Sequence, residues 1–367
     1  MMQLSSSIGA RWVGFGVAPA LAELLAGGVL PAEAKKKQRP APPVAQTEED
    51  RDEARGACSR SLNALFSACR TDLAVASFET RAVCVNLADA EDRAQCLDEI
   101  GPAREDGATQ CRAQRDARRA LCAKIGEAPY EPDMDPALFQ APRNPRRSNR
   151  FFPLDVGNRW VYQDSNKRIE IEVLNKTKRA SGVDCLVVND RVFVAGSVVE
   201  DTDDWVGLRT DGTVEYCGEL SRNYELTAGD DPQEVELVAI DGTFKTGVDG
   251  AKSGTLFMGT PVVGTTYRQE WAAGVAEDVG TVLSTTYRYG QSASLDQLVP
   301  RALAELMCAN GDCVVIADTS TLDPSGYEQK YFAPGVGKFL ETKPRKGTVV
   351  PLIACNVDAR CTSLPLP

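Results

Sequence analysis

The sequence predicts an α+β protein of two domains, in which a disulfide-stapled helical hairpin or bundle precedes a mainly antiparallel, all-β domain shaped as a curved sheet or half-barrel. Two observations lead to this prediction. Apolar residues recur every three or four positions before residue 127 and every second position after residue 151. The 12 cysteines fall into two sets of six, Cys58 to Cys122 and Cys185 to Cys361. An even number in each set is what a disulfide framework requires.

Residues 1–34 have the pattern of a secretory signal peptide. Arg11 precedes an apolar run from Trp12 to Leu30, and Ala32-Glu33-Ala34 matches a signal cleavage site. Residues 35–46 (KKKQRPAPPVAQ) are basic and proline-rich and are predicted to be an unstructured linker. We therefore expect an exported protein, periplasmic or extracellular. Acidic, Pro and Gly residues interrupt the apolar run, so no transmembrane segment is expected in the mature chain.

The segment 47–127 is predicted to be a cysteine-rich helical domain, because Ala, Arg, Glu, Asp and Leu dominate it. Its six cysteines are separated by 11, 15, 12, 15 and 11 positions. Eleven positions make about three helical turns, so the cysteines of each outer pair share a helix face. Two antiparallel helices would then align these cysteines in a nested pattern, which we favour over the other connectivities that six cysteines allow. The predicted pairs are Cys58–Cys122, Cys69–Cys111 and Cys84–Cys96.

Residues 128–150 contain five prolines and are predicted to be an extended connector to the β domain, residues 151–367. Residues 168–173 (RIEIEV) alternate strictly between polar and apolar side chains, as half-buried strands do. Further strands are expected at 187–188, 191–199, 264–271 and 280–289. Turns are expected at the dipeptides Asp211-Gly212, Asp241-Gly242, Asp249-Gly250 and Asn310-Gly311. One helix is expected at 295–307.

Composition narrows the possible functions. The chain contains no histidine, which excludes Ser-His-Asp and Cys-His catalysis and imidazole acid–base chemistry. It also has no CxxC motif, so zinc, haem and iron–sulfur sites are not expected. Residues 1–150 carry 21 basic and 21 acidic groups, whereas residues 151–367 carry 20 and 31. The acidic second part would repel phosphate, so no nucleic-acid partner is expected.

A series of motifs follows in order along the β part. They are Phe152-Pro153-Leu154-x-x-Gly157-x-x-Trp160-x-Tyr162, residues 247–252 (GVDGAK), 267–270 (YRQE), 276–278 (AED) and 331–337 (YFAPGVG). In these motifs the β part resembles a widespread family of exported bacterial proteins of uncharacterised function. The resemblance covers Tyr130 to Glu341 and implies an exported, β-rich domain with no assigned activity. The sequence departs from the family in a long insertion, 291–310, and in Cys217, where an aromatic residue is usual.

The resemblance also implies disulfide pairs in the β part. Cys185 and Cys313 lie at the family's usual cysteine positions and are expected to pair. The two departures together suggest an additional Cys217–Cys308 bridge. Cys355 and Cys361 are expected to close a small C-terminal loop.

Three functions remain open from the sequence. The first is a binding or structural module for a small-molecule, glycan, lipid or protein ligand. The second is a carboxylate-based hydrolase, for which Asp204, Glu270, Glu277 and Asp278 are the candidate catalytic residues. The third is a calcium-binding protein that uses Glu270, Glu277 and Asp278, because calcium prefers oxygen ligands. No cofactor other than calcium is expected.

A hairpin centred near Ala273-Gly274 would place Glu270 opposite Glu277, and Gln269 opposite Asp278. Like charges in directly opposed positions destabilise a sheet. Three arrangements would relieve the repulsion: the side chains turn into water, one carboxyl keeps its proton, or a cation lies between them. The sequence leaves these three open.

Overall fold

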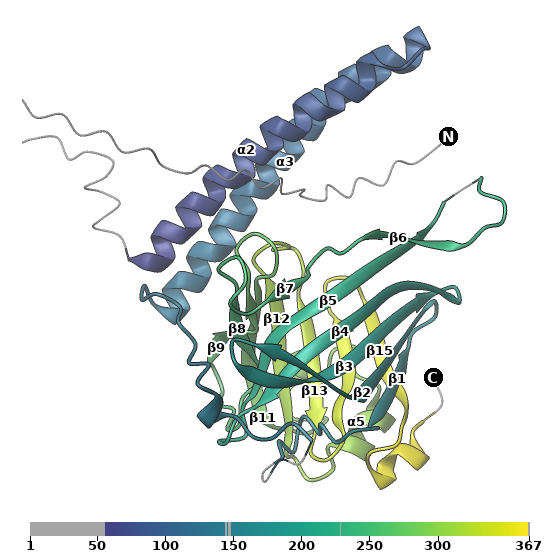
Figure 1. Ribbon diagram of the computed structural model, residues 1–367. Coiled ribbons are helices and arrows are strands. Elements are labelled where there is room, and N and C mark those ends of the chain that lie inside the picture. Colours follow the sequence, from purple (N-terminus) through teal and green to yellow (C-terminus); the bar gives the residue numbers. More distant parts are fainter. Residues whose placement is uncertain (1–55, 144, 146–147, 228, 366–367) are drawn as a thin grey trace, which may run out of the picture. The chain divides into compact units, whose positions relative to one another are not determined.

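The computed structural model describes residues 56–143, 145, 148–227 and 229–365. The predicted signal peptide, the linker and the start of the helical segment, residues 1–55, lie outside the described residues. Two long helices are followed by a 15-stranded antiparallel sheet (Figure 1). The predicted α+β fold, a stapled helical hairpin before an antiparallel β domain, is confirmed. The hairpin and the sheet belong to one compact unit that begins at Ala57.

The helices are α2 (Ala57–Val85), α3 (Ala90–Ile125), α4 (Ala293–Asp296) and α5 (Arg301–Met307), with 3-10 turns η1 (Pro136–Leu138) and η2 (Ala359–Ser363). The strands are β1 (Arg159–Gln163), β2 (Lys167–Ala180), β3 (Val183–Val194), β4 (Ser197–Leu208), β5 (Val214–Leu226), β6 (Val235–Ala239), β7 (Phe244–Lys245), β8 (Lys252–Phe257), β9 (Thr266–Arg268), β10 (Glu270–Trp271), β11 (Asp278–Tyr287), β12 (Cys313–Ser320), β13 (Glu328–Ala333), β14 (Gly337–Lys343) and β15 (Thr348–Cys355). The order of strands in the sheet is β10-β8-β5-β4-β3-β2-β1-β15-β14-β13-β12-β11-β9, with β6 and β7 also paired to β5.

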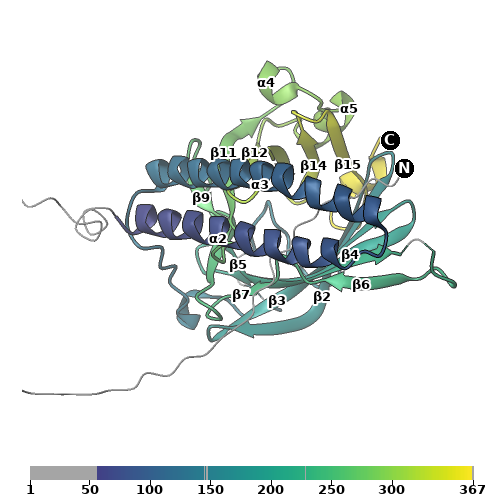
Figure 2. The same ribbon diagram turned by 90° about the horizontal axis from the view of Figure 1, so that it is seen from above.

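Helices α2 and α3 lie side by side as an antiparallel hairpin (Figures 1 and 2). Asp89 caps the start of α3 and accepts hydrogen bonds from the backbone N–H groups of Glu91 and Asp92. The hairpin has few buried apolar residues, and disulfides link its helices at three levels: Cys58–Cys122, Cys69–Cys111 and Cys84–Cys96. The nested pattern predicted from the spacing is confirmed.

The sheet nearly closes on itself because one stretch of chain forms both of its ends. Strand β9 pairs with β11, and β10, which follows after one residue, pairs with β8. The crossing of the backbones is close: a Cβ atom on Gly254 of β8 would lie 2.2 Å from the carbonyl carbon of Gln269. Glycine at 254 therefore allows this closure, which surrounds the interior of the sheet with strands.

The largest core cluster is formed by inward-facing residues of most strands together with α5, among them Trp160, Val206, Phe257 and Phe339. A smaller cluster contains Trp205 and packs against Phe139 and Met134 of the connector. The connector also hydrogen-bonds to the sheet, since the backbone N–H of Gln140 donates to Leu208 O over 2.8 Å. The connector thus runs along the β domain around residues 134–140.

Two predicted elements are wrong in detail. The expected strand 191–199 is interrupted by Ala195-Gly196, both of which have positive φ (50° and 88°). Positive φ at both central positions is typical of the tight turn that joins antiparallel strands, here β3 and β4. The expected helix 295–307 is divided into α4 and α5, because Pro300 lies between them and lacks the N–H that a continuous helix needs.

The predicted pairs Cys185–Cys313 and Cys217–Cys308 are also wrong. The structure joins Cys185 to Cys217 and Cys308 to Cys313, while the predicted Cys355–Cys361 pair is confirmed. Cys185 and Cys217 lie on β3 and β5, on either side of β4, where an irregularity in the β4–β5 register accompanies the bridge. Cys217 Sγ lies 3.3 Å from the place where a Cβ of Gly207 would be, so the missing side chain leaves room for the sulfur. Cys308 and Cys313 flank the short turn after α5.

Candidate ligand-binding site

The closed sheet contains a cavity of about 340 Å³. One part of its wall is apolar and is contributed by residues 151–154, Trp160 of β1, Ile171 and Val173 of β2, and Leu256 of β8. The other part carries carboxyl groups from β4, β5, β10 and β11. The lining therefore combines apolar residues and carboxyl groups, which we call the apolar wall and the acidic wall of the cavity.

Asp204 and Glu219 form a directly opposed pair of like charges on β4 and β5. The Tyr216 hydroxyl lies within hydrogen-bond distance of both carboxyls, at 3.0 Å from Glu219 Oε2 and closer still to Asp204 Oδ1. A tyrosine hydroxyl has one proton, so it donates to one carboxylate and can accept from the other group only if that group is protonated. Burial raises the pKa of Glu219 to about 7, and burial together with the neighbouring Glu219 raises the pKa of Asp204 well above its usual range.

Glu270 and Asp278 extend the acidic wall across the closure of the sheet. Glu270 is 9% exposed, and burial followed by repulsion from Asp278 and Glu219 raises its pKa well above the usual range. Asp278, in contrast, has an exposed side chain. Next to them, Lys330 of β13 forms an ion pair with Asp318 of β12. This lysine is thus already engaged by a carboxylate.

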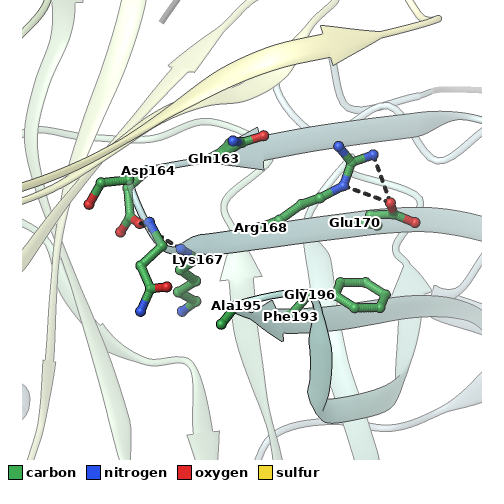
Figure 3. A pocket seen from close by; sticks show the side chains of 10 residues that line it. Gln163, Asp164, Lys167, Arg168, Glu170, Phe193, Ala195 and Gly196 are labelled. Carbon is green, nitrogen blue, oxygen red and sulfur yellow. Dashed lines mark hydrogen bonds and ion pairs between the residues drawn. The ribbon is translucent and has the colours of Figure 1, made fainter.

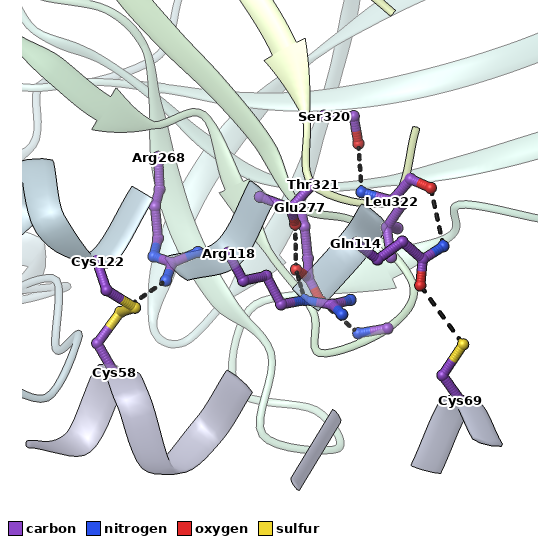
Figure 4. A network of polar contacts seen from close by, with 11 residues as sticks. Cys58, Cys69, Gln114, Arg118, Cys122, Arg268, Glu277, Ser320, Thr321 and Leu322 are labelled. Atoms are coloured by element: carbon purple, nitrogen blue, oxygen red, sulfur yellow. Dashed lines mark hydrogen bonds and ion pairs between the residues drawn. A yellow bond between two sulfur atoms is a disulfide. The ribbon is translucent and has the colours of Figure 1, made fainter. Parts of the chain in front are cut away.

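Glu277 does not join this acidic wall. Its side chain is 1% exposed and points toward helix α3, where Arg118 binds it through two hydrogen bonds of 2.7 and 2.9 Å (Figure 4). The Gly274 N–H donates to the same carboxylate over 2.7 Å, and the Thr321 hydroxyl also donates to it. Gln114 on α3 adds a hydrogen bond to Leu322 O. Glu277 therefore holds the helical hairpin against the sheet.

The predicted β-hairpin around Ala273-Gly274 agrees with the structure only in part. Gln269 N–H donates to Asp278 O and Arg268 pairs with Val279, so Gln269 lies opposite Asp278 as predicted, but Ala272 pairs with Ala276, which changes the register between the two pairs. Glu270 lines the cavity whereas Glu277 points to α3, so the expected opposed pair of these two carboxyls is not formed. None of the three expected arrangements applies to Glu277, because an arginine from a distant helix neutralises it. Within the described residues, no group of three or more Asp, Glu, Cys or His side chains is arranged to hold a metal ion. The proposed calcium set of Glu270, Glu277 and Asp278 is thus not assembled.

Three of the four predicted candidates, Asp204, Glu270 and Asp278, line the same cavity. Tyr216 and Glu219 were missed. Strict alternation places Tyr216 and Glu219 on opposite faces of β5, but the β4–β5 register shifts next to Gly218, which has a φ of 135°. This bulge brings Glu219 to the cavity. A glycine within a strand pattern is the one sequence signal that could have indicated it.

A second hollow, of about 460 Å³, lies between the β1–β2 and β3–β4 turns (Figure 3). Its carboxylates are already engaged: Glu170 forms ion pairs with both Arg168 and Arg191, and Asp164 accepts hydrogen bonds from the backbone N–H groups of its own turn. We therefore assign the candidate site to the interior cavity.

Comparison of the chain with protein-family models, with curated proteins and with solved structures finds no match. The resemblance to a family of exported proteins stays a prediction. All 12 cysteines are paired in six disulfides, each within its own half of the chain, as is typical of extracytoplasmic proteins. The helices of the described residues include none that is long and apolar enough to cross a membrane.

Proposed function

We propose that this chain is an exported binding protein that holds a small molecule in the interior cavity. The observation that carries the proposal is the cavity itself, with its apolar lining and its few carboxyl groups. Its volume of about 340 Å³ falls within the range of small-molecule pockets, about 300–1,000 Å³. Ligand pockets combine a mostly apolar lining with a few converging polar groups, and this cavity has both. The signal-like residues 1–34 and the six disulfides support export to the periplasm or the cell exterior.

The binding of 1-octanol to the purified, oxidised protein tests this proposal. Trp160 lines the cavity and donates its indole N–H to Val336 O over 2.7 Å, so its NMR signal reports on the interior. We expect 1-octanol to shift the Trp160 indole resonance in a saturable manner. The variant Val206→Phe should fill the cavity and abolish the effect, because Val206 is buried and lines it.

The matched control is Val238→Phe, since Val238 is 50% exposed on β6 and does not line the cavity. This variant should bind 1-octanol as the unmodified protein does. A saturable octanol effect that survives Val206→Phe would show that 1-octanol binds outside the cavity. The proposal fails if neither 1-octanol nor an octyl chain with a charged head group affects the unmodified protein.

The Asp204–Tyr216–Glu219 contact favours a second candidate, a carboxylate-based hydrolase. A carboxyl that keeps its proton beside an ionised one is the pairing that acid–base catalysis without histidine needs. Hydrolysis of p-nitrophenyl esters, phosphates or glycosides that disappears in both Asp204→Asn and Glu219→Gln would support this candidate. Hydrolysis that survives in these variants would count against it.

A further inference from the structure

Four carboxyl residues line the cavity without an ion pair among the described residues: Asp204, Glu219, Glu270 and Asp278. Two lysines also line the cavity. Lys330 forms an ion pair with Asp318, another carboxyl of the lining, and its charge also favours the ionised form of Asp278, whereas Lys338 pairs with Glu341 at 3.3 Å. The two lysines are therefore engaged, and Asp204, Glu219 and Glu270 form no ion pair with either of them.

Glu270 is the most deeply buried of these four residues, since nine-tenths of its surface is covered. Its carboxyl accepts a hydrogen bond from the backbone of Asp278 and forms no ion pair among the described residues. By contrast, Glu277, which lies seven residues further along the chain and is only 1% exposed, is bound by Nε and Nη2 of Arg118. A buried carboxylate is stable when it is paired with a cation, and the described residues supply none that forms an ion pair with Glu270.

The chemistry of the lining favours an organic cation over a metal ion. The described residues offer no group of three acidic, Cys or His side chains arranged around a metal ion. An apolar wall with Phe152, Leu154 and Trp160 adjoins the carboxyls and would give a metal ion nothing to bind. A cation with an organic body can contact both walls at once.

We infer that the ligand is an organic cation, an ammonium or guanidinium group attached to an apolar body. Its charge lies against Asp204, Glu219 and Glu270, and its body lies against the apolar wall. This inference rests on the proposed binding function. Ammonium and guanidinium groups supply three to five N–H donors, enough to reach several carboxyls. Burial and repulsion from neighbouring carboxylates raise the pKa of Glu219 to about 7. A cation bound beside these groups would favour their ionised forms.

The test compares three probes that share one chain length and differ in head group: octylammonium chloride, 1-octanol and sodium octanoate. Isothermal titration at pH 8, above the pKa of Glu219, measures their affinities for the full oxidised protein. We expect octylammonium to bind at least tenfold more tightly than 1-octanol, and octanoate to bind most weakly. The variants Glu270→Gln and Asp204→Asn should each weaken octylammonium binding about tenfold and leave 1-octanol binding unchanged.

The matched control is Asp203→Asn. Asp203 neighbours Asp204 on β4 but forms an ion pair with Arg222 at 3.2 Å and does not line the cavity, so its loss should change neither affinity. Circular dichroism checks that each variant folds, and the two acidic-wall variants test the inference independently. If 1-octanol or octanoate binds as tightly as octylammonium, or if both acidic-wall variants bind octylammonium normally, the inference is overturned while the binding function stands. If none of the three probes binds, the proposed function itself fails.

Discussion

Replacing Glu277 with Gln should destabilise the protein strongly, because this carboxylate is the buried contact between the hairpin and the sheet. The side chains of Arg118 and Glu277 are 6% and 1% exposed. The carboxylate accepts two hydrogen bonds from Arg118, one from Gly274 N–H and one from the Thr321 hydroxyl. Glutamine keeps one acceptor oxygen and turns two N–H donors toward groups that also donate.

The magnitude follows from this geometry. A hydrogen bond to a charged group contributes about 1.5–3 kcal/mol, and removing one partner of a buried ion pair costs about 3–5 kcal/mol. We therefore expect Glu277→Gln to lower the free energy of unfolding by about 3–5 kcal/mol. The double variant Arg118→Met/Glu277→Leu should lose less than the sum of its single variants, because it leaves no unpaired buried charge.

Urea unfolding of the oxidised protein, followed by circular dichroism, measures these losses. Hydrogen exchange of residues 272–277, the part of the sheet domain that contacts α3 through Glu277, shows whether the helical hairpin separates locally from the sheet. The control is Glu305→Gln, which removes an ion pair with Arg301 whose side chains are 71% and 53% exposed, and should cost less than about 1 kcal/mol. A loss below about 1 kcal/mol for Glu277→Gln, or strict additivity in the double variant, would refute the reasoning.

Two further predictions concern the disulfides and pH. Removing Cys69–Cys111 by double Ser substitution should lower the free energy of unfolding by about 4 kcal/mol, because the bridge closes a loop of about 31 residues once Cys84–Cys96 has formed. Removing Cys355–Cys361, which has a sequence separation of only 6, should lower it by about 2 kcal/mol. Equal losses in urea unfolding would contradict this ranking. The pKa of Glu219 is raised to about 7 in the folded protein from about 4.3 when unfolded, so the folded state binds the extra proton and loses stability as pH rises through this window. The melting temperature should therefore fall from pH 5 to pH 8, and it should fall less in Glu219→Gln; an identical pH profile in the variant would show that Glu219 does not titrate in this range.

Local patterns predicted the parts of the fold that depend on regular geometry. The separations of the first six cysteines follow the helical repeat, so their pairing could be worked out before the structure. Alternation in residues 168–173 indicated β2 for the same reason. The Cys185–Cys217 bridge could not be found in this way, because it depends on a strand irregularity and on the missing side chain of Gly207.

The candidate site was predicted in part. Its acidic residues were recognisable, but their roles depend on partners far away in sequence. Glu277 is neutralised by Arg118, 159 residues earlier, and no pattern near either residue indicates the contact. Glu219 reaches the cavity only because a bulge changes its face on β5. Closure of the sheet through β9 and β10 then brings Glu270 to carboxyls of β4 and β5.

The nested bridges of the hairpin also restrict which wrong pairs can form while the chain is being oxidised. Neighbouring cysteines along one helix, such as Cys58 and Cys69, are about 16 Å apart once the helix has formed. A disulfide requires Cα atoms about 4.4–6.8 Å apart, so helix formation alone prevents this pairing. Cys84 and Cys96 are the nearest pair across the turn, with a separation of 12. Once they are joined, the two helices are held in register. This register brings Cys69 next to Cys111 and Cys58 next to Cys122.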